Sequence, residues 1–334
     1  MLASAVQEVQ RWPAVVERAF NHRVAEGLYF NLGRLGLLGR CGARSRRALE
    51  RAFAVNQLVI SLLLEEEQSL VREIGRQDVK ATLLDAPSLT TVTYPEVSAR
   101  HHDGLEFCVD NDRDLERLRA CLVDSGYQPI GPDQWLWRIL LALRLAPYYL
   151  KNPTGVYHKL IRTERFTKHF TCFPYHPILF GPLLLSYVRI RKVRALTRSR
   201  CQPGRGALLP GQPSVTHIGS RSEDAIALLC MRAYRDILLE WQRQLRYLFD
   251  VVALVGRCEG HLDWPAVYRK AIECGGVAPV FYVLGQIRQI LAFPIPESFL
   301  AKLASSAEFT HSDFGDFLPV LLEKPFVAAV EFEE

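Results

Sequence analysis

The sequence predicts an α+β protein in which a small mixed β-sheet lies between an N-terminal helical segment and a C-terminal helical bundle. Three observations predict this order. Helical apolar spacing dominates before residue 76, short apolar runs of strand length follow between 79 and 173, and helical spacing returns after residue 214. The expected domains are a helical segment (1–76), an α/β core with a basic insertion (77–200) and a helical domain (214–334).

The first 75 residues are expected to be helical. Ser4 to Phe20 places apolar residues at helical intervals, and Ala54 to Ile74 does so more regularly. Three consecutive glutamates at 65–67 interrupt the second pattern on what should be a solvated face. Gly75 is expected to end this helix, because glycine commonly follows the last helical turn.

An α/β unit is predicted next. Val79 to Leu84 and Leu105 to Val109 are short apolar runs typical of strands. The turn Asp85-Ala86-Pro87-Ser88 follows the first of them, and a loop-like stretch leads to the second. Asp112 to Ser125 then has the spacing of an amphipathic helix, which Gly126 closes.

The middle of the chain, from residue 135 to residue 213, contains patterns typical of helices, of strands and of loops. Trp135 to Ala146 predicts an apolar helix, and alternating stretches in Val156 to Phe173 predict a β-hairpin. We expect a further helix over Leu183 to Leu196, and a loop over Arg198 to Pro213, which is rich in glycine, proline and arginine.

The last third is predicted to be helical. A long helix should begin at Ser222, which is a suitable N-cap followed by two acids, and run to about Val255. Asp263-Trp264-Pro265 should open another helix, and Pro279 to Leu291 a third.

The composition favours an intracellular globular protein. Of the 334 residues, 49% are hydrophobic and 23% are charged, which supports a sizeable core. The longest relevant uncharged run, His169 to Val188, contains histidines and prolines, so we expect no membrane span. The start MLASAVQEVQRW lacks the features of a signal peptide. The eight cysteines are scattered without a CxxC pair, which indicates reduced thiols in the cytoplasm.

One segment is strongly basic. Residues 144–205 contain thirteen lysines and arginines and a single acid, Glu164, with tyrosines and phenylalanines among the charges. Two interpretations stay open. The segment could be a surface for a phosphate-bearing ligand or an acidic protein or peptide partner, or a solvated face over core aromatics. A nucleic-acid partner is not expected, because no recognised binding motif is present.

Several pieces of the chain, in their order, carry a resemblance to a known family. They are GLYFNLGRLGLL (27–38), LLLEEEQSLVREIG (62–75), VKATLLDAPSL (79–89), HDGLEFCV (102–109), DRDLERLRACLVDSGYQP (112–129), SEDAIALLCMRAY (222–234), LRYLFDVVALV (245–255) and LDWPAVYRKA (262–271). From about Ala25 to Leu303 the chain resembles the uncharacterised nucleotidyltransferase family of the DNA polymerase beta superfamily.

The resemblance implies Mg²⁺-dependent transfer of a nucleotidyl group from a nucleoside triphosphate to a small molecule or peptide. In such chemistry, metal ions held by carboxylates stabilise the charge on the attacking and leaving oxygens. The family's paired aspartates align with Gly104 and Glu106, and its Lys-Gly turn aligns with Asp85-Ala86. Glycine carries no carboxylate, and Asp103 lies one position before Gly104. Asp103 and Glu106 are therefore the expected catalytic and metal-binding acids, with Glu164 as the third metal ligand.

The same resemblance implies contacts to the triphosphate. The expected contacting residues are Asp85, Ser88, Lys159, Arg162 and Lys168. Because the aligned positions depart from the family's pattern, an alternative stays open. In that alternative the fold is a catalytically inactive binding or scaffold protein that acts through its basic 144–205 surface. Asp103 and Glu106 would then be ordinary acids at the entrance of a strand.

Overall fold

The computed structural model describes residue 6 and residues 9–102, 104–109, 111–130, 155–162, 179–180, 183–192, 215–217, 222–239, 244–258 and 261–306. The helix predicted for Trp135 to Ala146, the loop predicted for Arg198 to Pro213 and the second arm of the hairpin predicted within 156–173 lie outside these residues.

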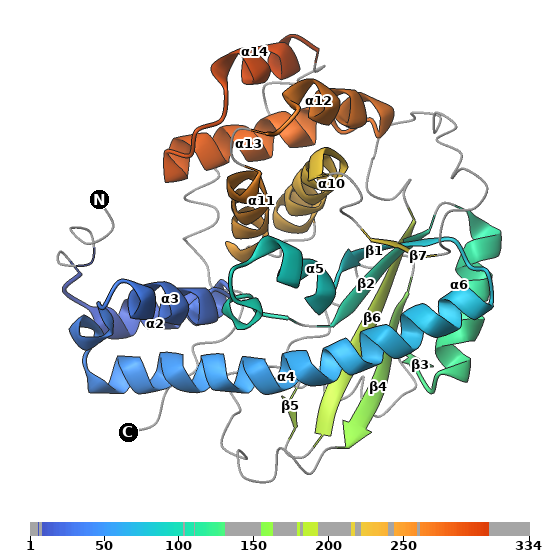
Figure 1. Ribbon diagram of the computed structural model, residues 1–334, viewed down its shortest axis with the longest axis horizontal. Coiled ribbons are helices and arrows are strands. Elements are labelled where there is room, and N and C mark those ends of the chain that lie inside the picture. Colours follow the sequence, from blue (N-terminus) through green and yellow to red (C-terminus); the bar gives the residue numbers. More distant parts are fainter. Residues whose placement is uncertain are drawn as a thin grey trace.

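The N-terminal segment is helical, as predicted. It consists of α2 (Trp12–Asn21), α3 (Ala25–Arg34), the short 3₁₀ turn η1 (Leu38–Cys41) and α4 (Ala43–Arg76). The 34-residue α4 is about 50 Å long, and it crosses almost the whole width of the molecule in Figure 1. Its first turns bury Leu49 and Ala52 against α2 and α3. Its last turns bury Leu70 and Ile74 against the sheet, so one helix spans two cores.

A mixed sheet forms the centre, which confirms the α+β class. Its strands are β1 (Ala81–Asp85), β2 (Leu105–Val109), β3 (Gln128–Pro129), β4 (Val156–Arg162), β5 (Leu179–Phe180), β6 (Leu183–Lys192) and β7 (Val215–His217). The order is β3-β4-β6-β2-β1-β7, with β5 also paired to β6. β1 is antiparallel to β2 and parallel to β7, whereas β6 is parallel to β2 and antiparallel to β4.

The helix predicted over Leu183 to Leu196 is wrong, because residues 183–192 form the strand β6. This strand hydrogen-bonds to β2 on one side and to β4 on the other. Tyr187, Val188 and Ile190 are buried there, and β-branched and aromatic side chains pack well on a pleated surface. Arg189 and Arg191 stand on either side of Ile190 in this strand.

The connections around β1 and β2 place their ends. Asp85 is the last residue of β1 and not the first of a turn, and the chain enters the short helix α5 (Pro87–Thr93) after Ala86. The 3₁₀ turn η2 (Val97–Ala99) precedes β2. The predicted helix at 112–125 is present as α6 (Asp112–Asp124), and Asn111 caps it by accepting from the Asp114 N–H at 2.8 Å.

The C-terminal part is a helical bundle. It contains α10 (Ser222–Tyr234) with the π-helical turn η5 (Arg235–Leu239), followed by α11 (Arg246–Arg257), α12 (Trp264–Glu273), α13 (Val277–Leu291) and α14 (Glu297–Ser306). The single helix predicted from Ser222 to Val255 is wrong, because α10 and α11 are separate helices that pack against each other. The helix start at Asp263 is confirmed, since its carboxylate accepts from the Ala266 N–H at 3.2 Å.

The bundle packs on the sheet through β1 and β2. Leu84 and Cys108 belong to the same buried cluster as Ile226, Met231 and Val251 of the bundle, and Figure 1 shows α10 and α11 beside the ends of these strands. The six described cysteines form no disulfide. None of the helices in the described ranges combines the length and apolarity needed to cross a membrane. The predicted domain boundaries stay a prediction.

Candidate functional site

A cluster of buried charges lies where the ends of β1 and β2 meet the bundle. Four acids and four arginines form it, and each is at most 6% exposed. We call these residues the buried charge cluster: Asp85, Glu106, Asp236, Asp250, Arg100, Arg189, Arg232 and Arg246. Four negative and four positive groups balance to a formal charge of zero. This balance allows them to be buried, because a buried charge is tolerated only when it is paired.

The strand register brings two of the acids together. Asp85 is paired with Glu106 across β1 and β2, with an irregularity in the register just before Asp85. Arg232 of α10 then reaches both carboxylates. Its Nη2 lies 2.7 Å from Asp85 Oδ2 and 3.1 Å from Glu106 Oε2, and its Nε lies 3.5 Å from Asp236 Oδ2 on the next turn. A guanidinium therefore occupies the place between two carboxylates where a cation is needed.

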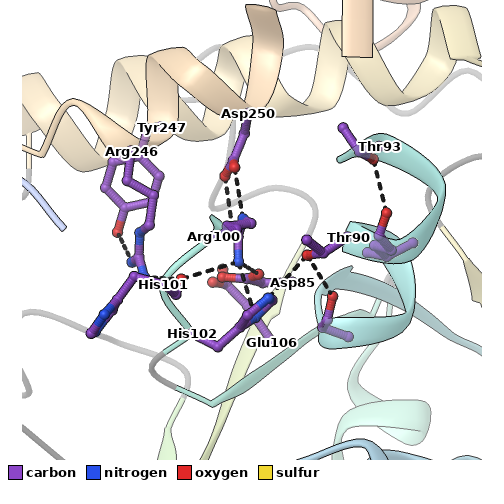
Figure 2. Close-up of polar contacts among 12 residues, drawn as sticks. Asp85, Thr90, Thr93, Arg100, His101, His102, Glu106, Arg246, Tyr247 and Asp250 are labelled. Atoms are coloured by element: carbon purple, nitrogen blue, oxygen red, sulfur yellow. Dashed lines mark hydrogen bonds and ion pairs between the residues drawn. The ribbon is translucent and has the colours of Figure 1, made fainter. Parts of the chain in front are cut away.

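Arg100 makes the second bridge between the sheet and the bundle. Its Nε and Nη2 donate to the two carboxylate oxygens of Asp250 at 2.6 and 2.7 Å, and its Nη1 lies 2.9 Å from Asp85 Oδ1. Figure 2 shows Arg100 between these two acids. The Tyr94 hydroxyl donates to Asp250 at 2.8 Å. Such a two-pronged contact fixes orientation as well as charge.

The ionisation of Asp85 follows from these contacts. Burial by itself would raise the pKa of Asp85, but Arg100 and Arg232 outweigh burial and hold that pKa well below its ordinary value. The pKa of Arg232 is raised well above its ordinary value, because Asp85 and Glu106 outweigh the effect of burial. The bridge is therefore an ion pair at neutral pH and not a pair of neutral groups.

His102 is held in its neutral form beside this bridge. Arg100 Nη1 lies 3.1 Å from His102 Nδ1, and Thr90 Oγ1 lies 3.0 Å from His102 Nε2. Because a guanidinium can only donate, Nδ1 must accept and the proton must be on Nε2, where it is donated to Thr90. Burial, followed by the charge of Arg100, lowers the pKa of His102 well below its ordinary value.

The loop that carries Arg100 and His102 is fixed from several sides. The Asn56 side chain of α4 donates to the carbonyls of Ser98 and Arg100 at 2.9 and 2.7 Å. His101 Nδ1 lies 2.8 Å from Glu26 of α3, and Arg246 of α11 donates to the His101 carbonyl at 3.2 Å. The N-terminal segment, the sheet and the bundle thus all contact this one loop.

The predicted site residues are distributed unevenly. Glu106 and Asp85 lie together in the buried charge cluster. Ser88 donates both its N–H, at 3.1 Å, and its hydroxyl to the carboxylate of Glu67. Lys159 Nζ lies 3.1 Å from Glu66 on α4. Each of these phosphate-contact candidates therefore already has a carboxylate partner.

Four further predicted residues cannot be placed in the same way. Asp103, Glu164 and Lys168 lie outside the described residues, and Arg162 is described only as the last residue of β4. Their predicted roles in metal and phosphate binding stay predictions.

Gly104 occupies a place that admits no side chain. Its φ is +142°, and a Cβ at this position would lie 2.3 Å from the Tyr187 carbonyl oxygen of β6. Gly104 is the position that the resemblance aligns with the first aspartate of the family's pair. The backbone of the neighbouring strand β6 therefore closes that position to a carboxylate.

The described residues do not fit a divalent metal in this arrangement. No group of three or more histidines, cysteines, aspartates or glutamates in the described ranges is arranged to hold a metal. Mg²⁺ needs several oxygen ligands in near-octahedral geometry. The two adjacent carboxylates, Asp85 and Glu106, instead surround the Nη2 of Arg232.

A pocket of about 320 Å³ adjoins the buried charge cluster between α5, α10 and α11. Its polar inner end includes Asp85, Arg100, Asp250 and Tyr94, and the exposed Arg257 also lines it. The remaining lining residues are Leu84, Ala86, Leu89, Thr90, Thr93, Ser222, Ala225, Leu229, Leu254 and Cys258. The volume is near the lower end of the range for small-molecule sites.

Sequence reasoning missed the arginines of this site. Arg232 and Asp236 are spaced four residues apart in the largely apolar stretch CMRAYRDIL, and this spacing is the signal that could have marked a buried pair. Their partners on β1 and β2 are more than a hundred residues away in sequence, so no local pattern identifies them.

Comparison with known proteins gives one match. The family model described as an uncharacterised nucleotidyltransferase matches residues 8–181, which are 174 of the 334 residues (181 − 8 + 1). No curated protein and no solved structure matches the chain. The match includes α2 to β5, and thus Asp85, Arg100 and Glu106, whereas Arg232 and Asp250 follow it. Because more than half of the chain is matched, this protein belongs to the uncharacterised nucleotidyltransferase family.

Proposed function

We propose that this nucleotidyltransferase-like protein is a ligand-binding and scaffold protein that does not carry out metal-dependent nucleotidyl transfer. The observation that carries the proposal is the Arg232 guanidinium, which lies 2.7 Å from Asp85 and 3.1 Å from Glu106. Nucleotidyl transfer by two metal ions needs carboxylates that are open to cations. A fixed guanidinium neutralises the carboxylates from within the chain.

Two further features support the proposal. Glu106 is only 1% exposed, so a metal ion would have to displace Arg232 and enter a buried place. The steric closure at Gly104, the residue before β2, prevents a second carboxylate two positions before Glu106. The buried charge cluster then serves to join the bundle to the sheet.

We propose that the pocket beside the cluster binds a nucleotide or another phosphate-bearing ligand. Arg257 supplies an exposed cation, and Ser222 and Thr93 supply hydroxyl groups in the lining. Leu89, Leu229 and Leu254 provide apolar contacts for the remainder of the ligand. The family to which the chain belongs supports a nucleotide as the first candidate.

A protein partner at the basic 144–205 segment is the second part of the proposal. In the described part of that segment, Arg189 is buried and lies 4.0 Å from Glu106, and Lys159 contacts Glu66. These two cations therefore contribute to internal ion pairs, and a partner surface has to use other charges of the segment.

Calorimetric titration tests the binding step. Wild-type protein is titrated with MgCl₂ alone, and with ATP in the presence of Mg²⁺ or EDTA. We expect no heat from Mg²⁺ alone, and ATP binding that is equal in Mg²⁺ and EDTA. Arg257→Gln should weaken ATP binding, whereas Arg288→Gln on the surface of α13 should not. Binding that requires Mg²⁺ and is lost in Glu106→Gln would contradict the proposal.

A turnover assay addresses the alternative, Mg²⁺-dependent transfer with Asp103, Glu106 and Glu164 as metal ligands, which family membership favours. Pyrophosphate release from each nucleoside triphosphate is measured with candidate amine, hydroxyl and peptide acceptors. Release that disappears in both Asp103→Asn and Glu106→Gln would establish this alternative. No release with any nucleotide agrees with the binding function.

A further inference from the structure

A dense group of arginines lies far from the buried charge cluster, where α3 leads through η1 into α4. Between residues 34 and 51 there are six arginines, no lysine and one acid, Glu50. All six are exposed. We call them the arginine corner: Arg34, Arg40, Arg44, Arg46, Arg47 and Arg51. The corner belongs to the helical segment at the left end of Figure 1, while the sheet lies to the right and the bundle lies above.

The helix geometry aligns part of the corner. Arg44, Arg47 and Arg51 are three and four residues apart on α4, so they share one face of the helix. They form a row about 10 Å long. The same turns bury Ser45, Leu49 and other residues on the opposite side, so the row points away from the core.

The connection between α3 and α4, which carries Arg40, is held by backbone hydrogen bonds. The Leu37 N–H donates to the Leu32 carbonyl at 2.8 Å, and the Arg40 N–H donates to the Leu37 carbonyl at 3.0 Å. Gly36 has a φ of +68°, the left-handed conformation that ends α3 and turns the chain. The corner is thus a shaped surface and not a run of charges on a loose loop.

An exposed apolar side chain lies within the corner. Leu35, the residue after Arg34, is 45% exposed and is among the most exposed large apolar residues in the described ranges. An exposed apolar side chain next to arginine is typical of a protein-binding surface, where arginine is enriched and lysine is depleted. A surface for single-stranded nucleic acid would instead offer aromatic rings for base stacking, and residues 34–51 contain no aromatic residue.

We propose that the arginine corner is a docking surface for an acidic, amphipathic segment of a partner protein. The partner's carboxylates accept hydrogen bonds from the arginine forks, which match a carboxylate with two parallel donors. An apolar side chain of the partner packs on Leu35. This surface is independent of the proposed function, because none of its residues lines the pocket or belongs to the buried charge cluster.

Fluorescence anisotropy with a defined probe tests the proposal. The probe is a labelled 18-residue peptide with glutamate and leucine at helical spacing, and its control has glutamine in place of every glutamate. The full chain is used at low and moderate salt. We expect the acidic peptide to bind, the glutamine peptide to bind at least tenfold more weakly, and salt to weaken binding.

Matched variants separate the corner from net charge. Arg44→Gln, Arg47→Gln and Arg51→Gln together should weaken peptide binding about tenfold, which corresponds to three exposed ion pairs of ordinary strength. The control replaces Arg72, Arg76 and Arg113, which are also exposed but lie on other turns, and should change binding less than twofold. Leu35→Ser alone should weaken binding about threefold, as expected for the loss of one partly exposed apolar contact.

Three outcomes would overturn the proposal. Equal weakening by both triple variants would mean that only net charge matters. Equal binding of the acidic and glutamine peptides would exclude the carboxylate contact. Tighter binding of a 20-nucleotide single-stranded DNA than of the acidic peptide, with the same dependence on Arg44, Arg47 and Arg51, would assign the corner to nucleic acid instead.

Discussion

Replacing Arg232 by methionine removes the central cation of the buried charge cluster and keeps most of the side-chain volume. Three contacts are lost at once, at 2.7 Å to Asp85, 3.1 Å to Glu106 and 3.5 Å to Asp236. The cluster changes from a formal charge of zero to −1. Removing one partner of a buried ion pair typically costs about 3–5 kcal/mol. Because domains are stable by only about 5–15 kcal/mol, Arg232→Met should lose a large part of the folding free energy.

Urea denaturation followed by circular dichroism at pH 7 measures this loss. We expect the free energy of unfolding to fall by about 3–5 kcal/mol relative to wild type. The difference should shrink as the pH falls towards 4.5. Without Arg232, one of the cations that lower the pKa of Asp85 is gone, so this pKa rises relative to wild type and protonation at acidic pH removes the uncompensated charge.

Two comparisons decide whether the reasoning holds. Arg288→Met on the surface of α13 should change stability by less than about 0.5 kcal/mol. Arg232→Lys keeps the charge but loses the fork that reaches two carboxylates, so it should lie between wild type and Arg232→Met. A loss below about 1 kcal/mol in Arg232→Met at pH 7 would show that Arg232 is not the main neutralising group.

Three other outcomes are expected. Gly104→Ala should destabilise the fold by about 1–3 kcal/mol in urea titrations, because its φ and the Tyr187 carbonyl leave no room for a Cβ; an unchanged midpoint would contradict the strand geometry. Below pH 6.5 the unfolded chain protonates His102, while the folded state keeps it neutral. Acidification should therefore lower the free energy of unfolding by up to about 1.4 kcal/mol for each pH unit through His102 alone. His102→Gln should remove this slope, and an identical pH profile would refute the assignment. Asn56→Ala should cost about 1–3 kcal/mol by leaving the Ser98 and Arg100 carbonyls unsatisfied; a matched loss in Asn31→Ala, whose contact is exposed, would argue against burial as the cause.

The spacing of apolar residues and the positions of glycine predicted those elements whose conformation depends mainly on their own residues. The strand at 105–109 and the helix at 112–124 appear where apolar runs, the helical spacing and Gly126 predict them. The residues of β6 were misread because a strand that is hydrogen-bonded on both sides owes its conformation to β2 and β4, which are distant in sequence. The break between α10 and α11 was missed because the apolar pattern continues through it.

The candidate site was predicted only in part for the same reason. The resemblance led to Asp85 and Glu106, which the structure places side by side. It did not predict their partners, since Arg232 is 147 residues from Asp85 and Arg100 is 150 residues from Asp250. Pairings at such separations follow from the topology of the sheet and bundle, which a single sequence does not specify.

The close approach of β6 to Gly104 has a consequence for how this chain can vary. A route by single substitutions towards a second carboxylate beside Glu106, at position 104 just before β2, would first have to move the backbone at Tyr187, and only then could this position accept a side chain. A second step would have to remove Arg232 while another cation neutralises Asp85 and Glu106. Either change alone is therefore expected to destabilise the fold, so neither prepares the chain for the other.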